Sequence, residues 1–151
     1  MRLPPFVWRW SASSPGPHVC IIGGTHGNEL VGITVARRLV DAFSSGAGKL
    51  GRGTLTMAIG NPEAVAQQTR GSTVHNDLNR CFGAASLTNS NPLSIEEKRA
   101  HELSPLLEAC DVLVDLHATN KPSPPFLRIA GAFGPKHQQA CGVSDCTVAF
   151  S

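Results

Sequence analysis

A histidine and a carboxylate three residues apart, His26 and Glu29, are the residues whose types and spacing first suggest chemistry. They belong to the segment GGTHGNE (residues 23–29), which follows an apolar run over residues 19–22. Residues i and i+3 project to neighbouring points of a helical turn, so an imidazole and a carboxylate at this spacing can bind one metal ion. The two glycines would allow a tight turn that exposes such a site.

The same segment is also compatible with a phosphate-binding turn, or with a plain turn that contains an incidental histidine. A P-loop requires Gly-Lys-Ser/Thr after its glycines, and the dinucleotide fingerprint requires G-x-G-x-x-G. Residues 23–29 match neither pattern.

A second histidine, His117, ends the apolar run over residues 111–117, which is typical of a strand covered on both faces of an α/β sheet. Ligands bind at the carboxyl ends of strands in such sheets. Together His26, Glu29 and His117 make two histidines and one carboxylate with an open position, which is the catalytic zinc arrangement. Asp115 lies on the same side of the strand as His117. It would orient a ligand histidine by accepting its free ring N–H, or it is a strand-end carboxylate that faces water.

Composition predicts a soluble globular protein in the cytoplasm. The 151 residues suit one domain, with 41% hydrophobic and 16% charged residues. A net charge of +2 is too small and too scattered to indicate nucleic-acid binding, and no apolar stretch has the length of a membrane span. The N-terminus lacks the apolar core of a signal peptide, and five widely spaced cysteines favour reduced thiols over a disulfide framework.

Strands that alternate with helices predict a layered α/β fold. Strands are expected at residues 6–11, 19–24, 54–59, 111–117, 126–130 and 146–150. Helices are expected at residues 28–43, 61–68, 94–110 and 135–140, with an exposed loop over residues 83–92. Pro105 is expected to kink the third helix or to restart it.

The helix over residues 28–43 has a predicted buried half and a predicted solvent half. The buried half comprises Val31, Val35, Ala36, Leu39, Val40 and Phe43. Glu29 falls at the edge of that half and is therefore expected to point inward. Burying an unpaired carboxylate is costly, and a bound cation would remove the cost.

Four motifs occur in an order that resembles one family: GGTHGNE at 23–29, NPEA at 61–64, DLNR at 77–80 and DLHAT at 115–119. They resemble the aspartoacylase/succinylglutamate desuccinylase family, zinc-dependent amide hydrolases related to the metallocarboxypeptidases. The resemblance implies an α/β/α fold with a central mixed, largely parallel sheet, similar to the zinc carboxypeptidase fold. It also implies one zinc ion per chain and a small N-acyl amino acid as substrate.

The same resemblance implies roles for individual residues. His26, Glu29 and His117 match the zinc ligands. Arg70 matches an arginine that stabilises the developing oxyanion, although residues 71–76 form a longer segment than the family usually has and an exposed surface charge is the alternative. Asn79 and Arg80 match the pair that binds the substrate carboxylate.

The resemblance covers only about the first half of such an enzyme, so residues 1–151 are expected to form an incomplete N-terminal zinc-hydrolase domain. The family's catalytic glutamate lies well beyond the last zinc histidine, and this sequence has no glutamate after Glu108. We therefore expect a deacylase of N-acyl amino acids whose residues 1–151 are inactive alone. A carboxypeptidase-like peptidase and a non-catalytic metal-binding or interaction module are the alternatives. The acyl group, the amino acid and the oligomeric state stay open.

Overall fold

The computed structural model describes residues 2–83, 87, 88, 91, 94–129, 134–142 and 147–150. Most of the loop expected over residues 83–92 lies outside the described residues, as do the expected strand ends at residues 130 and 146. The chain divides into two compact units, Met1–Ala118 and Thr119–Ser151.

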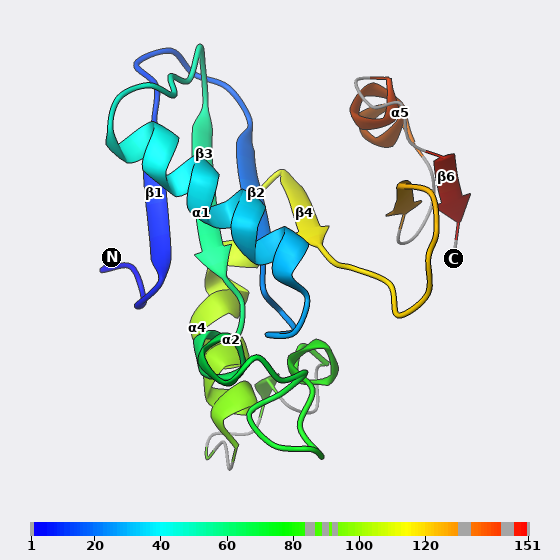
Figure 1. The fold of residues 1–151 in the computed structure, drawn as a ribbon. Coiled ribbons are helices and arrows are strands. Elements are labelled where there is room, and N and C mark those ends of the chain that lie inside the picture. Colours follow the sequence, from blue (N-terminus) through cyan, green and yellow to red (C-terminus); the bar gives the residue numbers. More distant parts are fainter. Residues whose placement is uncertain are drawn as a thin grey trace. The chain divides into compact units, whose positions relative to one another are not determined.

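The first unit is built on a four-stranded sheet in the order β1-β3-β2-β4 (Figure 1). Its strands are β1 (Val7–Ser11), β2 (His18–Gly23), β3 (Thr54–Ile59) and β4 (Val112–Leu116). β1 is antiparallel to β3, whereas β2 is parallel to both β3 and β4. Gly23 is in register with Ile59 and Leu116, so the carboxyl ends of the three parallel strands meet at one edge of the sheet. The predicted mixed, largely parallel sheet is confirmed.

Helices cover both faces of this sheet. Alternate strand residues point in opposite directions, so each face presents its own apolar side chains to a helix. Ala36 of α1 (Leu30–Ser44) packs on one face in a buried cluster with Leu55, Met57 and Ile59. α4 (Ile95–Glu108) covers the other face, where Leu103 and Leu106 join the cluster of Val7, Cys20, Ile22 and Ala58. The first unit is therefore an α/β/α sandwich, as expected.

Short elements lie near the carboxyl ends of the strands. Asn61 caps α2 (Pro62–Gln67) by accepting a hydrogen bond from the Ala64 N–H, and Asp77 caps the 3₁₀ helix η1 (Leu78–Arg80) by accepting from the Asn79 N–H. The predicted capping box of α4 is confirmed, because the Ser94 and Glu97 side chains accept from each other's backbone N–H groups.

The predicted start and buried face of α1 are partly wrong. α1 begins at Leu30, with Glu29 as its N-cap residue. Val31, expected inside, is 64% exposed, and Val35 is also exposed. The cause is a close backbone approach: an added Cβ on Gly32 would come within 2.5 Å of the Leu116 carbonyl oxygen. The smallest residue therefore faces the sheet, and the larger valines turn away.

α4 continues through Pro105 as one helix, so the expected restart after Ser104 is wrong. The expectation for β4 also fails. β4 is not covered on both faces by the described residues: Leu113 is 47% exposed, and Val114 is exposed as well.

The second unit contains β5 (Phe126–Ile129), α5 (Pro135–Cys141) and β6 (Thr147–Phe150). β5 and β6 pair in parallel, with Phe126 opposite Thr147, and α5 connects them. None of the helices in the described part of the chain has the length and apolar character of a membrane span.

Candidate metal site

The turn after β2 places His26 and Glu29. Gly24 has a φ of +74°, a left-handed conformation that favours glycine, and an added Cβ there would approach Ile33 and Val65 to 2.9 Å. The Glu29 N–H then donates to the His26 carbonyl oxygen at 3.3 Å. The two side chains therefore meet across a turn that precedes α1, and the prediction that they lie on a helical turn is wrong.

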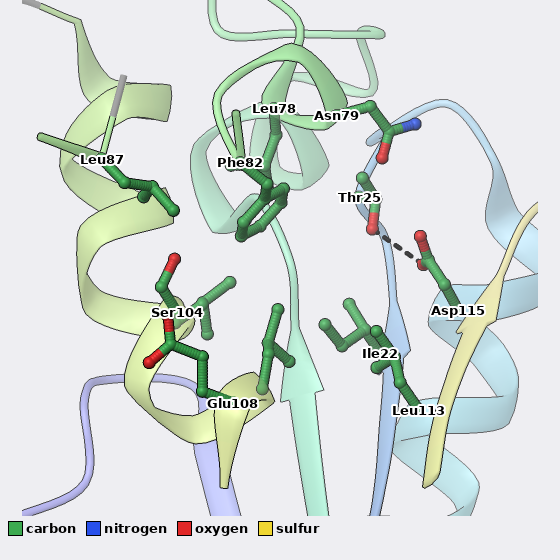
Figure 2. Close-up of a pocket in the computed structure, with 12 residues that line it drawn as sticks. Ile22, Thr25, Leu78, Asn79, Phe82, Leu87, Ser104, Glu108, Leu113 and Asp115 are labelled. Atoms are coloured by element: carbon green, nitrogen blue, oxygen red, sulfur yellow. Dashed lines mark hydrogen bonds between the residues drawn. The ribbon is translucent and has the colours of Figure 1, made fainter. Parts of the chain in front are cut away.

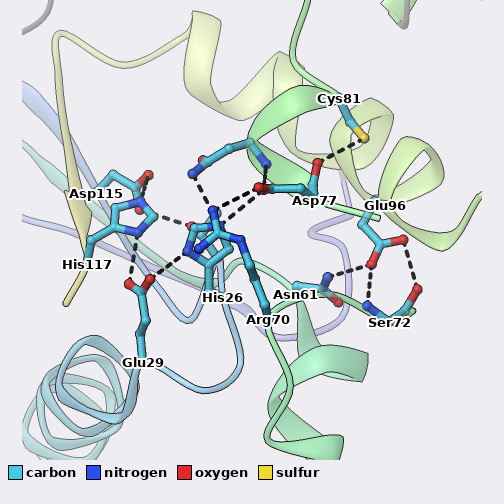
Figure 3. Close-up of polar contacts among 12 residues, drawn as sticks. His26, Glu29, Asn61, Arg70, Ser72, Asp77, Cys81, Glu96, Asp115 and His117 are labelled. Atoms are coloured by element: carbon cyan, nitrogen blue, oxygen red, sulfur yellow. Dashed lines mark hydrogen bonds and ion pairs between the residues drawn. The ribbon is translucent and has the colours of Figure 1, made fainter. Parts of the chain in front are cut away.

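The Glu29 carboxylate lies between two imidazole rings (Figure 3). Its Oε1 is 2.7 Å from Nδ1 of His26, and its Oε2 is 2.9 Å from Nδ1 of His117. The Ala118 backbone N–H also donates to Oε2, at 2.7 Å. One ligand atom from each of His26, Glu29 and His117 lies within 4.8 Å of the others. β2 and β4 thus bring together the three residues that the sequence singled out for metal binding.

The other nitrogen of each ring contacts an aspartate. His26 Nε2 is 3.1 Å from Oδ1 of Asp77, and His117 Nε2 is 2.8 Å from Oδ2 of Asp115. The Thr25 hydroxyl donates to the second oxygen of Asp115 at 3.0 Å. Asp115 thus makes the contact that an orienting role requires; the role itself stays a prediction.

Sequence reasoning missed the contact between Asp77 and His26. Asp77 also accepts hydrogen bonds from the Arg70 guanidinium at 2.9 Å and from the Asn79 N–H at 3.0 Å. Asp77 and His26 are 51 positions apart, and local sequence patterns gave no sign of the pairing.

These contacts shift two pKa values. Burial acts to raise the pKa of Asp77, but hydrogen bonds from Arg70 and His26 outweigh it and lower the pKa below its usual range. The hydrogen bond with Asp115 raises the pKa of His117 above that of an ordinary histidine, against the effect of burial.

The three residues expected to act on substrate differ in their contacts with the metal cluster. The Arg70 side chain is 52% exposed and reaches the cluster through Asp77. Asn79 Nδ2 lies 3.5 Å from Nε2 of His26. Arg80, the last residue of η1, is exposed, and in the described part of the chain it forms none of the hydrogen bonds that join the others.

The ring nitrogens and the carboxylate of the cluster are arranged to bind a cation. A neutral imidazole has one N–H to donate, yet His26 faces Glu29 and Asp77, and His117 faces Glu29 and Asp115. Two neutral histidines therefore cannot satisfy all four contacts. If each Nε2–H donates to its aspartate, both Nδ1 lone pairs and the Glu29 carboxylate are left facing one another. That is the ligand chemistry of a divalent cation, with outer carboxylates fixing the rings.

An apolar pocket of about 300 Å³ borders the cluster on the side of α4 (Figure 2). The Thr25–Asp115 hydrogen bond lies at one side of it, and Asn79 at the top. Its apolar lining includes Ile22, Leu78, Phe82, Leu103 and Leu113.

Comparison with known proteins identifies similar chains. The family model of the succinylglutamate desuccinylase/aspartoacylase catalytic domain matches residues 15–143. A probable aspartoacylase of Nostoc sp. is 40% identical over 106 residues, covering 67% of this chain and 35% of the relative. An N-acyl-aromatic-L-amino acid amidohydrolase (carboxylate-forming) of Danio rerio is 33% identical over 111 residues, covering 67% and 33%.

A solved structure gives the same result for the fold. Murine aminoacylase 3 superposes with a TM-score of 0.69 at 27% identity, covering 92% of this chain and 48% of that one. The chain spans about a third of the length of the curated relatives it matches.

Proposed function

Because the chain belongs to the succinylglutamate desuccinylase/aspartoacylase family, we propose that it forms the metal-binding part of a zinc-dependent hydrolase that cleaves the amide bond of N-acyl amino acids. One observation carries the proposal: both histidine Nδ1 atoms face the Glu29 carboxylate, while each Nε2 contacts an aspartate. The names of the relatives, an aspartoacylase and an N-acyl amino acid amidohydrolase, support the substrate class.

His26, Glu29 and His117 would bind one zinc ion. Zinc, when bound, activates water and polarises a carbonyl group. Asp77 and Asp115 hold the two rings so that Nδ1 of each faces Glu29, and they strengthen both imidazoles as ligands by accepting a hydrogen bond from each Nε2–H.

Arg70, Asn79 and Arg80 would act on the substrate. Arg70 donates a hydrogen bond to Asp77, which also contacts the candidate ligand His26. From there its charge would stabilise negative charge on the amide oxygen, worth roughly 3–4 kcal/mol in comparable oxyanion sites. Asn79 and Arg80 are adjacent in η1. The planar fork of an arginine suits the carboxylate of an amino acid.

Metal analysis tests the site. The purified protein should contain near-stoichiometric zinc, and His26→Ala or His117→Ala should lose most of it, since each removes one of three ligands. His75→Ala, which changes an exposed loop histidine, is the matched control. Wild-type metal content in both ligand variants would contradict the proposed site.

Hydrolysis of three substrate classes, measured on a protein that contains this chain together with the rest of a family member, tests the reaction. N-acetyl-aspartate and N-succinyl-glutamate should be cleaved in preference to short unacylated peptides. Faster peptide cleavage would indicate a carboxypeptidase-like enzyme, and zinc binding without any hydrolysis would indicate a non-catalytic module.

We also propose a cytoplasmic location, because Cys20, Cys81 and Cys110 are free.

A further inference from the structure

A buried carboxylate outside the metal cluster, that of Glu96, joins two segments of the first unit (Figure 3). Glu96 lies in the first turn of α4 and is 0% exposed. A buried charge is costly unless hydrogen bonds compensate it. Glu96 is fully compensated: Oε1 accepts from the Ser72 N–H at 2.6 Å and from the Asn61 amide at 3.0 Å, and Oε2 accepts from the Ser72 hydroxyl at 2.9 Å.

Both partners of Glu96 lead to the His26–Asp77 pair. The Asn61 N–H donates to the carbonyl oxygen of Gly24, in the turn that carries His26. Ser72 lies in the segment that carries Arg70 and Asp77. That segment is compact, because the Thr69 hydroxyl donates to the Gly71 carbonyl oxygen and a Cβ on Gly71 would overlap the Asn76 carbonyl.

The charge state of Glu96 agrees with this linking position. Burial acts to raise the pKa of Glu96, but the hydrogen bonds from Ser72 and Asn61 lower it below its usual range. The side chain is therefore an ionised acceptor at neutral pH, and charge-assisted hydrogen bonds are about twice as strong as neutral ones.

We infer that Glu96 is a positioning residue. It holds residues 70–77 against Asn61, the N-cap residue of α2, so that Asp77 contacts Nε2 of His26 and Arg70 stays hydrogen-bonded to Asp77. The inference rests on the proposed function for its consequence. Within the described part of the chain, the side-chain hydrogen bonds of Glu96 go to Asn61 and Ser72, and none goes to a candidate ligand or to a residue expected to bind substrate. The two hydrogen bonds from Ser72 tie Glu96 to the segment that carries Asp77, so its effect on zinc is expected to pass mainly through Asp77.

Two readouts test the inference, and the first needs no metal. Glu96→Gln keeps the size of the side chain but removes its charge, so amide hydrogen exchange over residues 69–77 should become faster in the metal-free protein. Ser72→Ala, which removes one partner from the other side, should act in the same direction. Glu108→Gln, an exposed glutamate of the same helix, should leave exchange unchanged. Melting temperatures would identify any variant that fails to fold.

Zinc affinity is the second readout, measured by competition with a chelator. Glu96→Gln should weaken zinc binding about 3- to 10-fold, less than the roughly 10–100-fold expected when an outer partner such as Asp77 is itself lost. In an Asp77→Asn background the effect of Glu96→Gln should largely vanish, because the two changes interrupt one path. Equal losses in both backgrounds, or no loss in either, would overturn the inference.

A wild-type chain that binds no zinc would instead contradict the proposed function. The inference would then be decided by exchange alone, and unchanged exchange over residues 69–77 in Glu96→Gln and Ser72→Ala would overturn it.

Discussion

The two aspartates that contact the histidine rings, Asp77 and Asp115, have different surroundings. Asp77 shares its carboxylate among His26, Arg70 and a backbone N–H, whereas Asp115 contacts His117 and the Thr25 hydroxyl. Losing Asp77 would release an arginine as well as a histidine. Losing Asp115 would affect the orientation and basicity of one ligand, which makes it the cleaner test of an outer carboxylate.

Asp115→Asn should weaken zinc binding roughly 10–100-fold without abolishing it, because a neutral amide replaces the charged acceptor that orients the His117 ring. Chelator competition measures the change, with Asp41→Asn on the exposed side of α1 as control. Zinc affinity equal to that of the wild type would refute the orienting role.

Zinc affinity should fall as the pH falls through the raised pKa of His117. Below that pKa both ring nitrogens of His117 carry a proton, and zinc must displace the one on Nδ1. The hydrogen bond that His117 donates to Asp115 is the main cause of the raised pKa. In Asp115→Asn the acid loss of affinity should therefore move to lower pH. Chelator titrations between about pH 5.5 and 8 would show it.

The free energy of unfolding of the metal-free protein should have the opposite pH dependence to zinc affinity. A raised folded-state pKa stabilises the fold at pH values below the ordinary histidine pKa, and this stabilisation is lost as the pH rises through the raised value. A wild-type unfolding free energy that shows no such loss, relative to Asp115→Asn, would contradict the assignment to His117.

At the element scale, the sequence predicted the strands and most helices because apolar runs, capping residues and prolines act locally. It could not predict how α1 is rotated, since that depends on Gly32 meeting Leu116, a contact between distant parts of the chain. The motifs identified His26, Glu29 and His117. The pairing of Asp77 with His26 was missed, because it too is a contact between distant parts of the chain. The burial of Glu96 also depends on a loop that local patterns do not specify.

Gly32→Ala should destabilise the first unit and displace the start of α1, because the new Cβ would press on the Leu116 carbonyl. Overpacking of this kind costs about 1–3 kcal/mol, and more where the obstacle is backbone. Urea unfolding measures the loss, and zinc affinity should fall with it. Gly51→Ala is the matched control, because nothing lies within 4 Å of a Cβ at that position. Equal stability of the two variants would contradict the close packing.

At the scale of the whole molecule, the α/β/α architecture of the first unit agrees with the family, while the chain matches about a third of each curated relative. Among the described residues, the three carboxylates of the candidate metal site each contact a histidine ring. Glu29 contacts both histidines, and Asp77 and Asp115 accept from the outer nitrogens. A hydrolase also needs a general base to take a proton from water and pass it to the leaving amine.

The isolated 151-residue chain should therefore bind zinc yet hydrolyse N-acetyl- or N-succinyl-amino acids slowly or not at all. A missing general base typically costs about 10²–10⁴-fold. Steady-state assays of the zinc-loaded chain measure this, with a full-length member of the family as the active reference. Robust turnover that disappears in Asp77→Asn or Asp115→Asn would show that one of these carboxylates is the base.

The parallel pairing of β2 with β4 also determines when the site is completed. Parallel strands cannot be joined by a hairpin, and Glu29 and His117 are separated by 88 residues. At about 5–20 residues per second, a ribosome needs roughly 4 to 18 s to synthesise that stretch. During this interval the nascent chain contains His26 and Glu29 without their third partner. The full ligand set first exists when β4 has emerged and joined the sheet.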